Sequence, residues 1–411
     1  MRDSSPLCDL AINVTKKVVG RAKNPDAAYV GLEHLETDNP RIQGSLPAST
    51  SISVNTVFRP GDTLFGKLRP NLRKVAAADF GGYCSTDILV IRPLAGVDPS
   101  FLSHSLRSTK VLNHAAGTAF GTKMPRTAWV EIKHLAIFAP SLFEQRRVAE
   151  ILDTLDEQIS TTKHIVEKLK SAQQGLAAQL LMHGMGASDH SMDATIARVP
   201  TGWEVAPLEK FKSNRRPHLK TGPFGSSLKQ DHWVDEGVPV VTIGSLGDGH
   251  FINSELLHIS ARTALSLSSY ALEEGDIVFS RVADVGRSIV VGERENGWIM
   301  SSNMMWISLD QARVDPRFVR ANIASNPRMR DQIRRFVNSS GRDVANAKIM
   351  NLLRFPWPPL DEQRAIANII ACGSEQIVAE QRRLAKLGYL RQGLMMDLLS
   401  GHVRISLEAS T

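Results

Sequence analysis

The chain lacks the features that would place it in a membrane or outside the cell. Its 411 residues contain no apolar run of about 18 residues, and no apolar stretch follows a basic start at the N-terminus. The three cysteines, Cys8, Cys84 and Cys372, are odd in number and far apart, without a Cys-x-x-Cys pair. Neither a disulfide framework nor a zinc knuckle is therefore indicated, and we expect a cytoplasmic protein.

Recognisable catalytic motifs are also missing. There is no HExxH, no GxSxG, no metal-spaced His/Cys cluster and no NPPY- or DPPY-type loop. The segment from Gly61 to Lys67 has the glycine spacing of a P-loop, but Leu68 stands where a Ser or Thr would bind magnesium. An Asp62 and Lys67 nuclease-like pair fails as well, because no acid lies two residues before the lysine. We expect no catalytic residue, no metal site and no cofactor in this chain.

Positive charge, by contrast, is in excess. Lys and Arg number 49 against 42 Asp and Glu, which gives a formal net charge of +7. An excess of this sign favours a polyanionic partner, although it does not identify one.

Short segments recur at a nearly constant offset, which indicates an internal duplication. Gly61-Asp62 recurs as Gly275-Asp276, Val97-Asp98-Pro99 as Val314-Asp315-Pro316, Glu144-Gln145-Arg146 as Glu362-Gln363-Arg364, and Gln174-Gly175-Leu176 as Gln392-Gly393-Leu394. Two like halves present two like surfaces, so the repeat favours a partner that is itself nearly symmetric.

Each half predicts a mixed α/β domain followed by a long helix, so the chain belongs to the α+β class. Short β-rich runs alternate with Gly, Pro and Asn turns in the domains, and the helical segments contain no proline. The predicted order is a first domain (1–142), a helix (143–184), a flexible linker (185–202), a second domain (203–360), a second helix (361–401) and a tail (402–411).

The two helical segments share one apolar seam. Steps of four and three residues from Val148 to Leu180 meet apolar side chains except at Thr162 and Gln173, and polar residues recur at the equivalent Glu380 and Arg391. One interpretation is that each helix is amphipathic and packs on its own domain. The other is that the helices pair with each other in an antiparallel coiled coil, with shared polar layers setting the register.

A helix of about 36 residues spans roughly 54 Å, so the pair would act as a spacer with one domain at each end. Successive major-groove faces of B-DNA lie about 34 Å apart, and two such domains could read two half-sites.

Basic and turn-rich stretches supply the candidate nucleic-acid contacts. Their Lys and Arg side chains can bind phosphates or base edges, and Gly-rich turns with hydroxyls resemble phosphate clamps. Some of the basic residues in these stretches are instead expected to lie on helix faces exposed to solvent, without binding DNA. The candidates are Lys67, Arg69, Arg73, Lys74, Thr122, Lys123, Arg215, Arg216, Lys229, Arg281, Arg287, Ser340 and Arg342.

Taken together, these features resemble the specificity subunit of Type I restriction-modification systems, over nearly the whole chain. The resemblance rests on the doubled helix starts at 140–146 and 358–364, the Gln-Gly-Leu interiors, and the helix ends at 180–184 and 398–401. Residues 200–205 resemble the usual entry to a target-recognition domain, whereas the first half lacks such a Gly-Trp entry, so its true N-terminus is open.

The resemblance implies a DNA-binding, non-catalytic subunit that reads a bipartite target in double-stranded DNA, one domain per half-site. It further implies two modification subunits carrying S-adenosylmethionine, and restriction subunits using ATP and Mg²⁺, as partners. Two alternatives stay open: a coiled-coil protein scaffold with incidental DNA binding, and an autonomous nuclease or ATPase.

Overall fold

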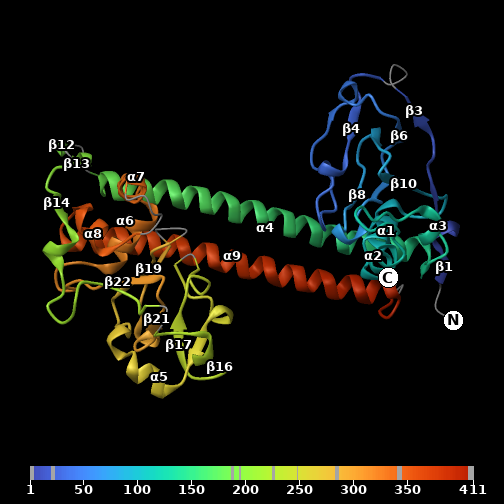
Figure 1. The fold of residues 1–411 in the computed structure, drawn as a ribbon. Coiled ribbons are helices and arrows are strands. Elements are labelled where there is room, and N and C mark those ends of the chain that lie inside the picture. The colour runs from blue at the N-terminus through green and yellow to red at the C-terminus, as the bar shows by residue number, and fades with distance from the viewer. Residues whose placement is uncertain are drawn as a thin grey trace, which may run out of the picture. The chain divides into compact units, whose positions relative to one another are not determined.

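The computed structural model describes residues 4–19, 24–186, 189–193, 196–224, 227–247, 249–282, 287–339 and 345–405. The chain divides into two compact units (Figure 1). Unit 1 comprises Met1–Ile165 with Glu380–Thr411, and unit 2 comprises Val166–Ala379. Each unit thus combines one globular domain with part of both long helices, α4 (Leu142–His183) and α9 (Leu360–Ser400). Among the described residues, no helix has the length and apolar character that crossing a membrane requires.

Two sheets build the domain of unit 1, and three helices cover one of them. One sheet has the order β2 (Ala11–Asn13), β10 (Ile88–Pro93), β7 (Thr63–Gly66), β8 (Val75–Ala77). The other has the order β3 (Lys17–Val18), β6 (Asn55–Phe58), β9 (Gly82–Ser85), β4 (Ala28–Val30), β5 (Leu46–Pro47), and its β4–β9 pair is parallel. The helices are α1 (Pro99–Leu106), α2 (Thr109–Gly117) and α3 (Trp129–Ile132). Strand β1 (Ser4–Pro6) pairs with β11 (Ala136–Phe138), next to α4 in the chain.

Unit 2 repeats this plan with other residues. One sheet has the order β15 (Leu219–Thr221), β22 (Met304–Ile307), β19 (Ile277–Ser280), β20 (Ser288–Val290). The other has the order β16 (Trp233–Val234), β18 (Leu257–Ile259), β17 (Val238–Val241), β21 (Ile299–Met300), with β17–β21 parallel. The helices are α5 (Ala261–Ser266), α6 (Pro316–Ser325), α7 (Pro327–Ser339) and α8 (Ala347–Leu352). Strand β14 (Glu204–Pro207) pairs with β23 (Arg354–Trp357), next to α9 in the chain. The predicted duplication of a mixed α/β domain is confirmed.

The repeated Gly-Asp pair forms the same turn in both units. Gly61 and Gly275 have φ angles of 85° and 87°, a backbone region that favours glycine. The following carboxylates, Asp62 and Asp276, are buried and accept the N–H of the residue three positions earlier, at 2.9 Å in each case. A buried carboxylate needs a counter-ion, and Arg92 supplies it to Asp62 through two 2.7 Å hydrogen bonds. The motif therefore stabilises the fold.

The glutamine of the repeated Glu-Gln-Arg motif ties each domain to its own long helix. The Oε1 atom of Gln145 accepts the Asp98 N–H at 2.9 Å, and Gln363 accepts the Asp315 N–H at 3.1 Å. Asp98 and Asp315 are the N-caps of α1 and α6, so the repeated Val-Asp-Pro and Glu-Gln-Arg segments form one device. Each domain is thereby held at the start of α4 or α9.

The glutamate of the same motif reaches the end of the other long helix. In unit 1, Glu144 accepts two hydrogen bonds of 2.9 Å from the guanidinium of Arg404, just beyond the end of α9. In unit 2, Glu362 accepts the N–H of Met185, just beyond the end of α4, at 3.2 Å, and the Nε1–H of Trp203, which follows β13, at 3.1 Å. Such contacts join the start of one helix to the end of its partner.

Pairing of the long helices is visible inside each unit, and it is antiparallel. Unit 1 has a core cluster of Phe101 from α1, Leu152 from α4 and Leu398 from α9, together with neighbouring residues. Unit 2 has a matching cluster that includes Leu180 from α4 and Ile366 from α9. Both interpretations of the seam are thus correct, because each helix packs on its own domain and on the other helix.

The predicted seam departs from the buried face at Leu176 of α4 and at the equivalent Leu394 of α9, whereas Leu180 and Leu398 beyond them are buried. Leu176, a predicted seam residue, is 42% exposed, whereas its neighbour Ala177 is buried. In α9 the corresponding Leu394 is half-buried and Met395 is buried. A straight helix drifts by about 20° per heptad from a 3.5-residue repeat, so the apolar face moves by nearly one residue between Val148 and Leu176.

One predicted polar layer makes contacts between α4 and α9 in unit 2. The Nε2 atom of Gln173 donates to the Ile370 carbonyl at 2.6 Å and to the Ser374 hydroxyl at 3.2 Å. A Cβ atom on Gly373 would lie 1.7 Å from the Gln173 Oε1. Gly373 of the second seam therefore leaves room for the side chain of Gln173 of the first seam, because it has no side chain of its own.

This fit predicts opposite effects of two Gly→Ala changes in α9. Gly373→Ala should lower the free energy of unfolding by about 1 kcal/mol, because displacing Gln173 loses two hydrogen bonds and outweighs the gain in helix propensity. Gly388→Ala, where a Cβ atom meets nothing within 4 Å, should raise it by about 1 kcal/mol. Urea denaturation measures both. Equal effects of the two changes on the free energy of unfolding would contradict the fit of Gln173 against Gly373.

The segment between the halves differs from the predicted flexible linker. Strands β12 (His190–Asp193) and β13 (Ala197–Pro200) form a hairpin. Ile196 and Val199 are buried against Trp203 and α9. The Gly, Ser and Asp content of this segment predicted a flexible coil. The hairpin is instead held in place because Ile196 and Val199 pack against Trp203 and α9.

Candidate nucleic-acid interface

The basic segment after β7 lies against a hairpin formed by residues 120–126 of unit 1. The Lys67 N–H donates to the Asp87 carbonyl at 2.9 Å, and the Lys67 carbonyl accepts the Thr127 N–H at 3.0 Å. Leu68 also forms a β-bridge with Arg126. Two stretches that the sequence offered as separate candidates are thereby brought together.

Two arginines of this segment have an unusual backbone conformation. Arg69 and Arg73 have φ angles of 53° and 54° and flank a short 3₁₀ turn, η5 (Pro70–Leu72). The Arg69 N–H donates to the Pro125 carbonyl at 2.7 Å, which fastens the turn to the hairpin. The left-handed conformation costs a non-glycine residue roughly 1–2 kcal/mol. Strain of this kind gathers at functional sites, which favours a binding role for this turn.

The hairpin itself is narrow and closed by two hydrogen bonds. The Phe120 N–H donates to the Arg126 carbonyl at 3.0 Å, and the Arg126 N–H donates to the Phe120 carbonyl at 2.9 Å. Gly121, with a φ angle of 100°, starts the turn. Thr122 and Lys123 lie at its tip and are exposed. We call the exposed candidates Arg69, Thr122 and Lys123 the basic hairpin surface.

Other cations near this surface bind acidic or carbonyl groups of the protein. Arg126 donates to Asp87 at 3.0 Å, and this hydrogen bond raises the pKa of the Arg126 guanidinium. Arg73 donates to Asp38 at 2.7 Å, and the Lys74 ammonium donates to a backbone carbonyl at 2.7 Å. Arg73 and Lys74 therefore contribute to holding the segment, whereas the basic hairpin surface faces solvent.

Arg281 of unit 2 occupies the position that Lys67 occupies in unit 1. It follows β19, its N–H donates to the Asn303 carbonyl at 3.0 Å, and its carbonyl accepts the Ala345 N–H at 2.8 Å. Its guanidinium also donates to the carbonyls of Ala345 and Ser302, at 3.1 and 3.3 Å. Burial lowers the pKa of Arg281. The backbone framework is the same in both units, but this cation is turned into the protein.

Arg216 is the counter-ion of the second buried turn carboxylate. Its Nη1 lies 2.9 Å from Asp276 and 3.2 Å from Glu273, and its Cζ lies 3.6 Å from the centre of the Trp306 ring. Burial raises the pKa of Asp276, against the hydrogen bond from the Glu273 N–H and the charge of Arg216. Arg216 thus does for Asp276 what Arg92 does for Asp62, from a different position in the chain.

The remaining candidates of unit 2 lie on loops. Arg215, Lys229 and Arg287 are exposed, and Arg287 also donates to a carbonyl at 3.4 Å. Ser340 and Arg342 lie outside the described residues. DNA contact by all of these candidates stays a prediction.

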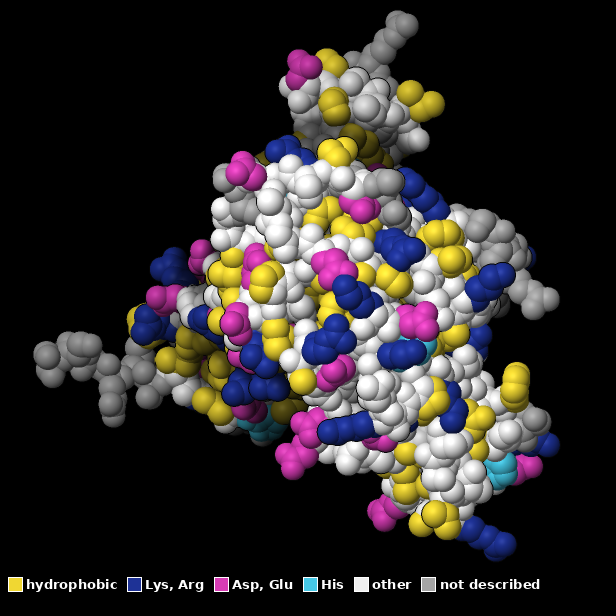
Figure 2. Space-filling view, turned by 90° about the vertical axis from the view of Figure 1, so that its left-hand side faces the viewer, with side chains coloured by type: hydrophobic (Ala, Val, Ile, Leu, Met, Phe, Trp, Pro, Cys, Tyr) yellow, Lys and Arg dark blue, Asp and Glu magenta, His cyan; other side chains and the backbone are white. Residues whose placement is uncertain are grey.

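Figure 2 shows the side of the molecule where α6 and α7 lie, and its charges are mixed. Lys and Arg side chains alternate with Asp and Glu across this face and do not gather in one patch. Charge density alone therefore does not locate a DNA-binding surface on this side.

Sequence reasoning did not single out Arg126 or the apolar side chains beside the hairpin. Phe120 is 61% exposed, Met124 49% and Leu72 37%. Phe120 and Met124 are brought near Leu72 by the contact between the hairpin and η5. No local sequence pattern predicts this contact. Among the described residues, no group of three or more His, Cys, Asp and Glu side chains could hold a metal ion.

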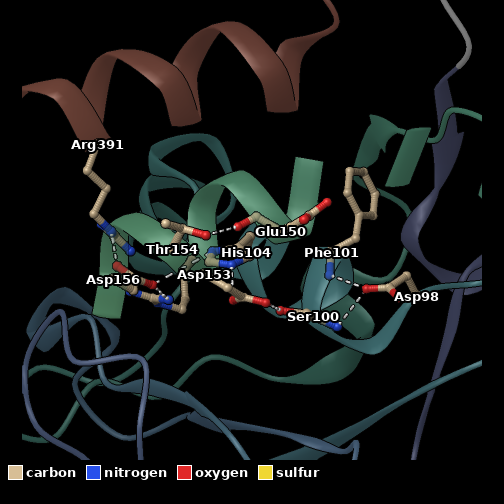
Figure 3. A network of polar contacts seen from close by, with 10 residues as sticks. Asp98, Ser100, Phe101, His104, Glu150, Asp153, Thr154, Asp156 and Arg391 are labelled. Carbon is tan, nitrogen blue, oxygen red and sulfur yellow. Dashed lines mark hydrogen bonds and ion pairs between the residues drawn. The ribbon is translucent and has the colours of Figure 1, made fainter. Parts of the chain in front are cut away.

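A buried charge network in unit 1 fastens the domain to both long helices (Figure 3). His104 of α1 lies 2.7 Å from Asp153 of α4, and Arg107 donates to Asp156 at 2.9 Å. Arg391 reaches Asp156 from α9. Burial raises the pKa of Asp156, but Arg107 and Arg391 outweigh it, and the net pKa is lowered. The network therefore holds the carboxylate in its charged form and fixes α1 on the helices.

Comparisons with known proteins agree on one family. The family model described as Type I restriction modification DNA specificity domain matches residues 51–171 and 220–387. The putative type I restriction enzyme MjaX specificity subunit of Methanocaldococcus jannaschii is 23% identical over 323 residues, 78% of this chain and 72% of that protein. The EcoBI specificity subunit of Escherichia coli is 23% identical over 300 residues, 67% of this chain and 62% of that protein.

Solved structures share the fold. The S subunit of the Type-I restriction-modification system from M. genitalium superimposes with a TM-score of 0.61 at 14% sequence identity. The match covers 96% of this chain and 95% of that one.

Proposed function

Because this chain belongs to the family of Type I restriction-modification DNA specificity subunits, which recognise DNA targets, we propose that it reads a split target, one half-site per unit. The observation that carries this proposal is the doubled scaffold with unlike surfaces. Lys67, after β7, and Arg281, after β19, make equivalent backbone hydrogen bonds. The Arg281 guanidinium also donates to carbonyls of its own unit, which the Lys67 side chain does not do among the described residues. Two readers of different sequences need a shared framework and different side chains at its surface.

In unit 1 the contacts we propose come from the basic hairpin surface. Arg69 is held by the Pro125 carbonyl and Lys123 is presented on the closed hairpin, so both cations are placed by the backbone. Phosphate contacts position a protein on the duplex, and bidentate arginine contacts read guanine. For unit 2, Arg215, Lys229 and Arg287 are the exposed candidates that we retain, with Ser340 and Arg342.

We also propose that the long helices dock two modification subunits, which carry S-adenosylmethionine, and that restriction subunits using ATP and Mg²⁺ can join. The relatives are specificity subunits of type I restriction enzymes, which supports an association of this chain with other subunits of such a system. So do exposed apolar side chains at equivalent positions of the helices, Ile151 and Ile369, each 37% exposed. In unit 1, Ile151 and Leu394 line a groove of about 340 Å³. In this proposal the chain itself catalyses no reaction.

The test is a domain exchange in the assembled methyltransferase. Residues 1–142 are replaced by the matching segment of a relative with a different target, and N6-methyladenine is mapped across modified DNA. Because Gln145 accepts the N–H of Asp98, the donor segment must keep an Asp-Pro start to its first domain helix. We expect one half of the methylated motif to change and the other to stay.

The reciprocal exchange of residues 203–360 is the matched control, and it should change only the other half. If either exchange alters both halves, or neither, the proposal of one reader per unit is wrong. A scaffold with incidental DNA binding would instead show methylation that does not depend on the exchanged domain. Activity of the lone chain as a nuclease or ATPase would favour the third interpretation.

A further inference from the structure

A phenylalanine of the hairpin that carries Thr122 and Lys123 is exposed. Phe120 is 61% exposed, and exposed apolar side chains also occur at Met124 of the same hairpin, at 49%, and at Leu72 of η5, at 37%. Burying a phenylalanine side chain contributes roughly 1.5–3 kcal/mol to folding, which this position forgoes. One exposed apolar residue is ordinary in a soluble protein, so the case for a role depends on how the ring is held and what surrounds it.

The backbone under the ring is fixed from two sides. Phe120 exchanges two hydrogen bonds with Arg126, and Arg126 forms a second bridge with Leu68 on its other side. The Arg126 guanidinium is in turn held by Asp87, at 3.0 Å. On the far side of Phe120, a Cβ atom on Gly121 would lie 3.4 Å from the Met124 carbonyl, so the turn is tight. The ring is thus presented by a rigid hairpin.

Two exposed cations belong to the same hairpin and to the turn fastened to it. Lys123 lies three residues away at the tip of the hairpin, and Arg69 is fastened to the hairpin through the Pro125 carbonyl at 2.7 Å. The nearby carboxylates of Asp87 and Asp38 are paired with Arg126 and Arg73. An exposed aromatic ring in the same hairpin and turn as exposed cations suits a ligand that has both phosphates and aromatic faces. Stacked DNA bases next to their phosphates are such a ligand.

We infer that Phe120 inserts beside or between bases of the half-site that unit 1 contacts, while Lys123 and Arg69 bind the flanking phosphates. Apolar wedges of this kind unstack a base step and kink the duplex. The inference rests on the proposed function, because it requires unit 1 to bind DNA. If Phe120 inserts in this way, recognition depends on how easily the base step deforms as well as on hydrogen bonds to base edges.

The test compares Phe120→Ala with three other variants in the assembled methyltransferase. Ile52→Ala removes another exposed apolar side chain of the same unit, 88% exposed and outside both long helices, and serves as the control. Lys123→Gln removes a cation of the basic hairpin surface. Phe120→Trp keeps an aromatic face. Each variant is titrated with target DNA over a range of salt concentrations, and 2-aminopurine is placed at successive steps of the half-site to detect unstacking.

We expect Phe120→Ala to weaken target binding about tenfold, which corresponds to about 1.4 kcal/mol. The salt slope should be unchanged because no charge is lost, and the 2-aminopurine signal should disappear at one base step. Phe120→Trp should keep that signal, and Ile52→Ala should behave like the parent protein. Lys123→Gln should weaken binding with a shallower salt slope.

Three outcomes would overturn the inference, and they differ in whether the proposed DNA contacts of unit 1 remain supported. If Phe120→Ala keeps full affinity and every 2-aminopurine signal while Lys123→Gln weakens binding, the wedge is wrong and the proposed function survives. If affinity falls without any change in unstacking, Phe120 contacts a groove surface such as a thymine methyl. If neither variant affects DNA binding, this surface does not contact the half-site, and the proposed DNA contacts of unit 1 fail too.

Discussion

Replacing Asp156 with alanine is expected to lower the free energy of unfolding of unit 1 by about 3–5 kcal/mol, because it leaves the buried Arg107 and the half-buried Arg391 without their carboxylate. Asp156 is 8% exposed, and it is the shared partner of Arg107 from the domain and Arg391 from α9. The loss should be seen in urea denaturation followed by circular dichroism, and as faster hydrogen exchange in α1 and the adjoining part of α4.

Glu150→Ala is the matched control, because it removes a carboxylate from the same helix at an exposed site. Its ion pair with Arg147 joins side chains that are 64% and 55% exposed, and such pairs contribute about 0.5 kcal/mol or less. If Asp156→Ala costs no more than Glu150→Ala, the charge network does not hold the domain on the helices.

The sign of the pH dependence follows from the same contacts. Asp156 has a lowered pKa, and so has Asp153, where burial raises the pKa but the contact with His104 outweighs it. The stability they contribute is present above the unfolded pKa of about 3.9 and is lost as the pH falls through the folded pKa. Acid should therefore destabilise the parent protein more steeply than the Asp156→Ala variant below about pH 4.

Neutralising the basic hairpin surface is expected to weaken DNA binding with little dependence on sequence. In the double variant Arg69→Gln and Lys123→Gln, two phosphate-binding cations are lost while side-chain size is largely kept. Each phosphate contact contributes about 0.9 to the slope of log K against log salt, so the slope should become shallower by about 1.8. Affinity should fall more than tenfold at low salt, where the electrostatic contribution is greatest.

A double variant on α4, Lys163→Gln and Lys168→Gln, makes the same change in net charge at exposed helix positions. Fluorescence anisotropy with labelled duplexes of target and unrelated sequence measures both variants. The α4 variant should keep the slope of the parent protein. Identical slopes for the two double variants would mean that net charge, and not this surface, governs binding.

The repeated motifs show how much of the fold could be predicted from the sequence. Their order and spacing predicted two α/β domains and two paired long helices, and both are confirmed. The polar interruption at Gln173 lies where the helices meet, through its hydrogen bonds to Ile370 and Ser374, but the sequence did not predict which residues of the second helix it would contact. What spacing did not supply was the reason for Gly373, since that reason is a side chain on the other helix.

The candidate site was less predictable, as two adjacent arginines illustrate. Arg215 and Arg216 lie in one basic stretch and were equal candidates for DNA contact. In the structure Arg215 is exposed, whereas Arg216 pairs with Asp276, which lies 60 positions further along the chain. A formal charge in a sequence is the same whether its counter-ion is a phosphate or a buried carboxylate.

The duplication, the lengths of the helices and most of their apolar seams can be read from the order of the residues, because they follow from local pattern and the 3.6-residue period of the helix. Which cations face solvent, and the contact of the hairpin at 120–126 with the turn between Arg69 and Arg73, depend on the folded chain. Those outcomes depend on contacts between residues far apart in the chain, where burial and pairing determine whether a charge stabilises the fold or is left for a partner.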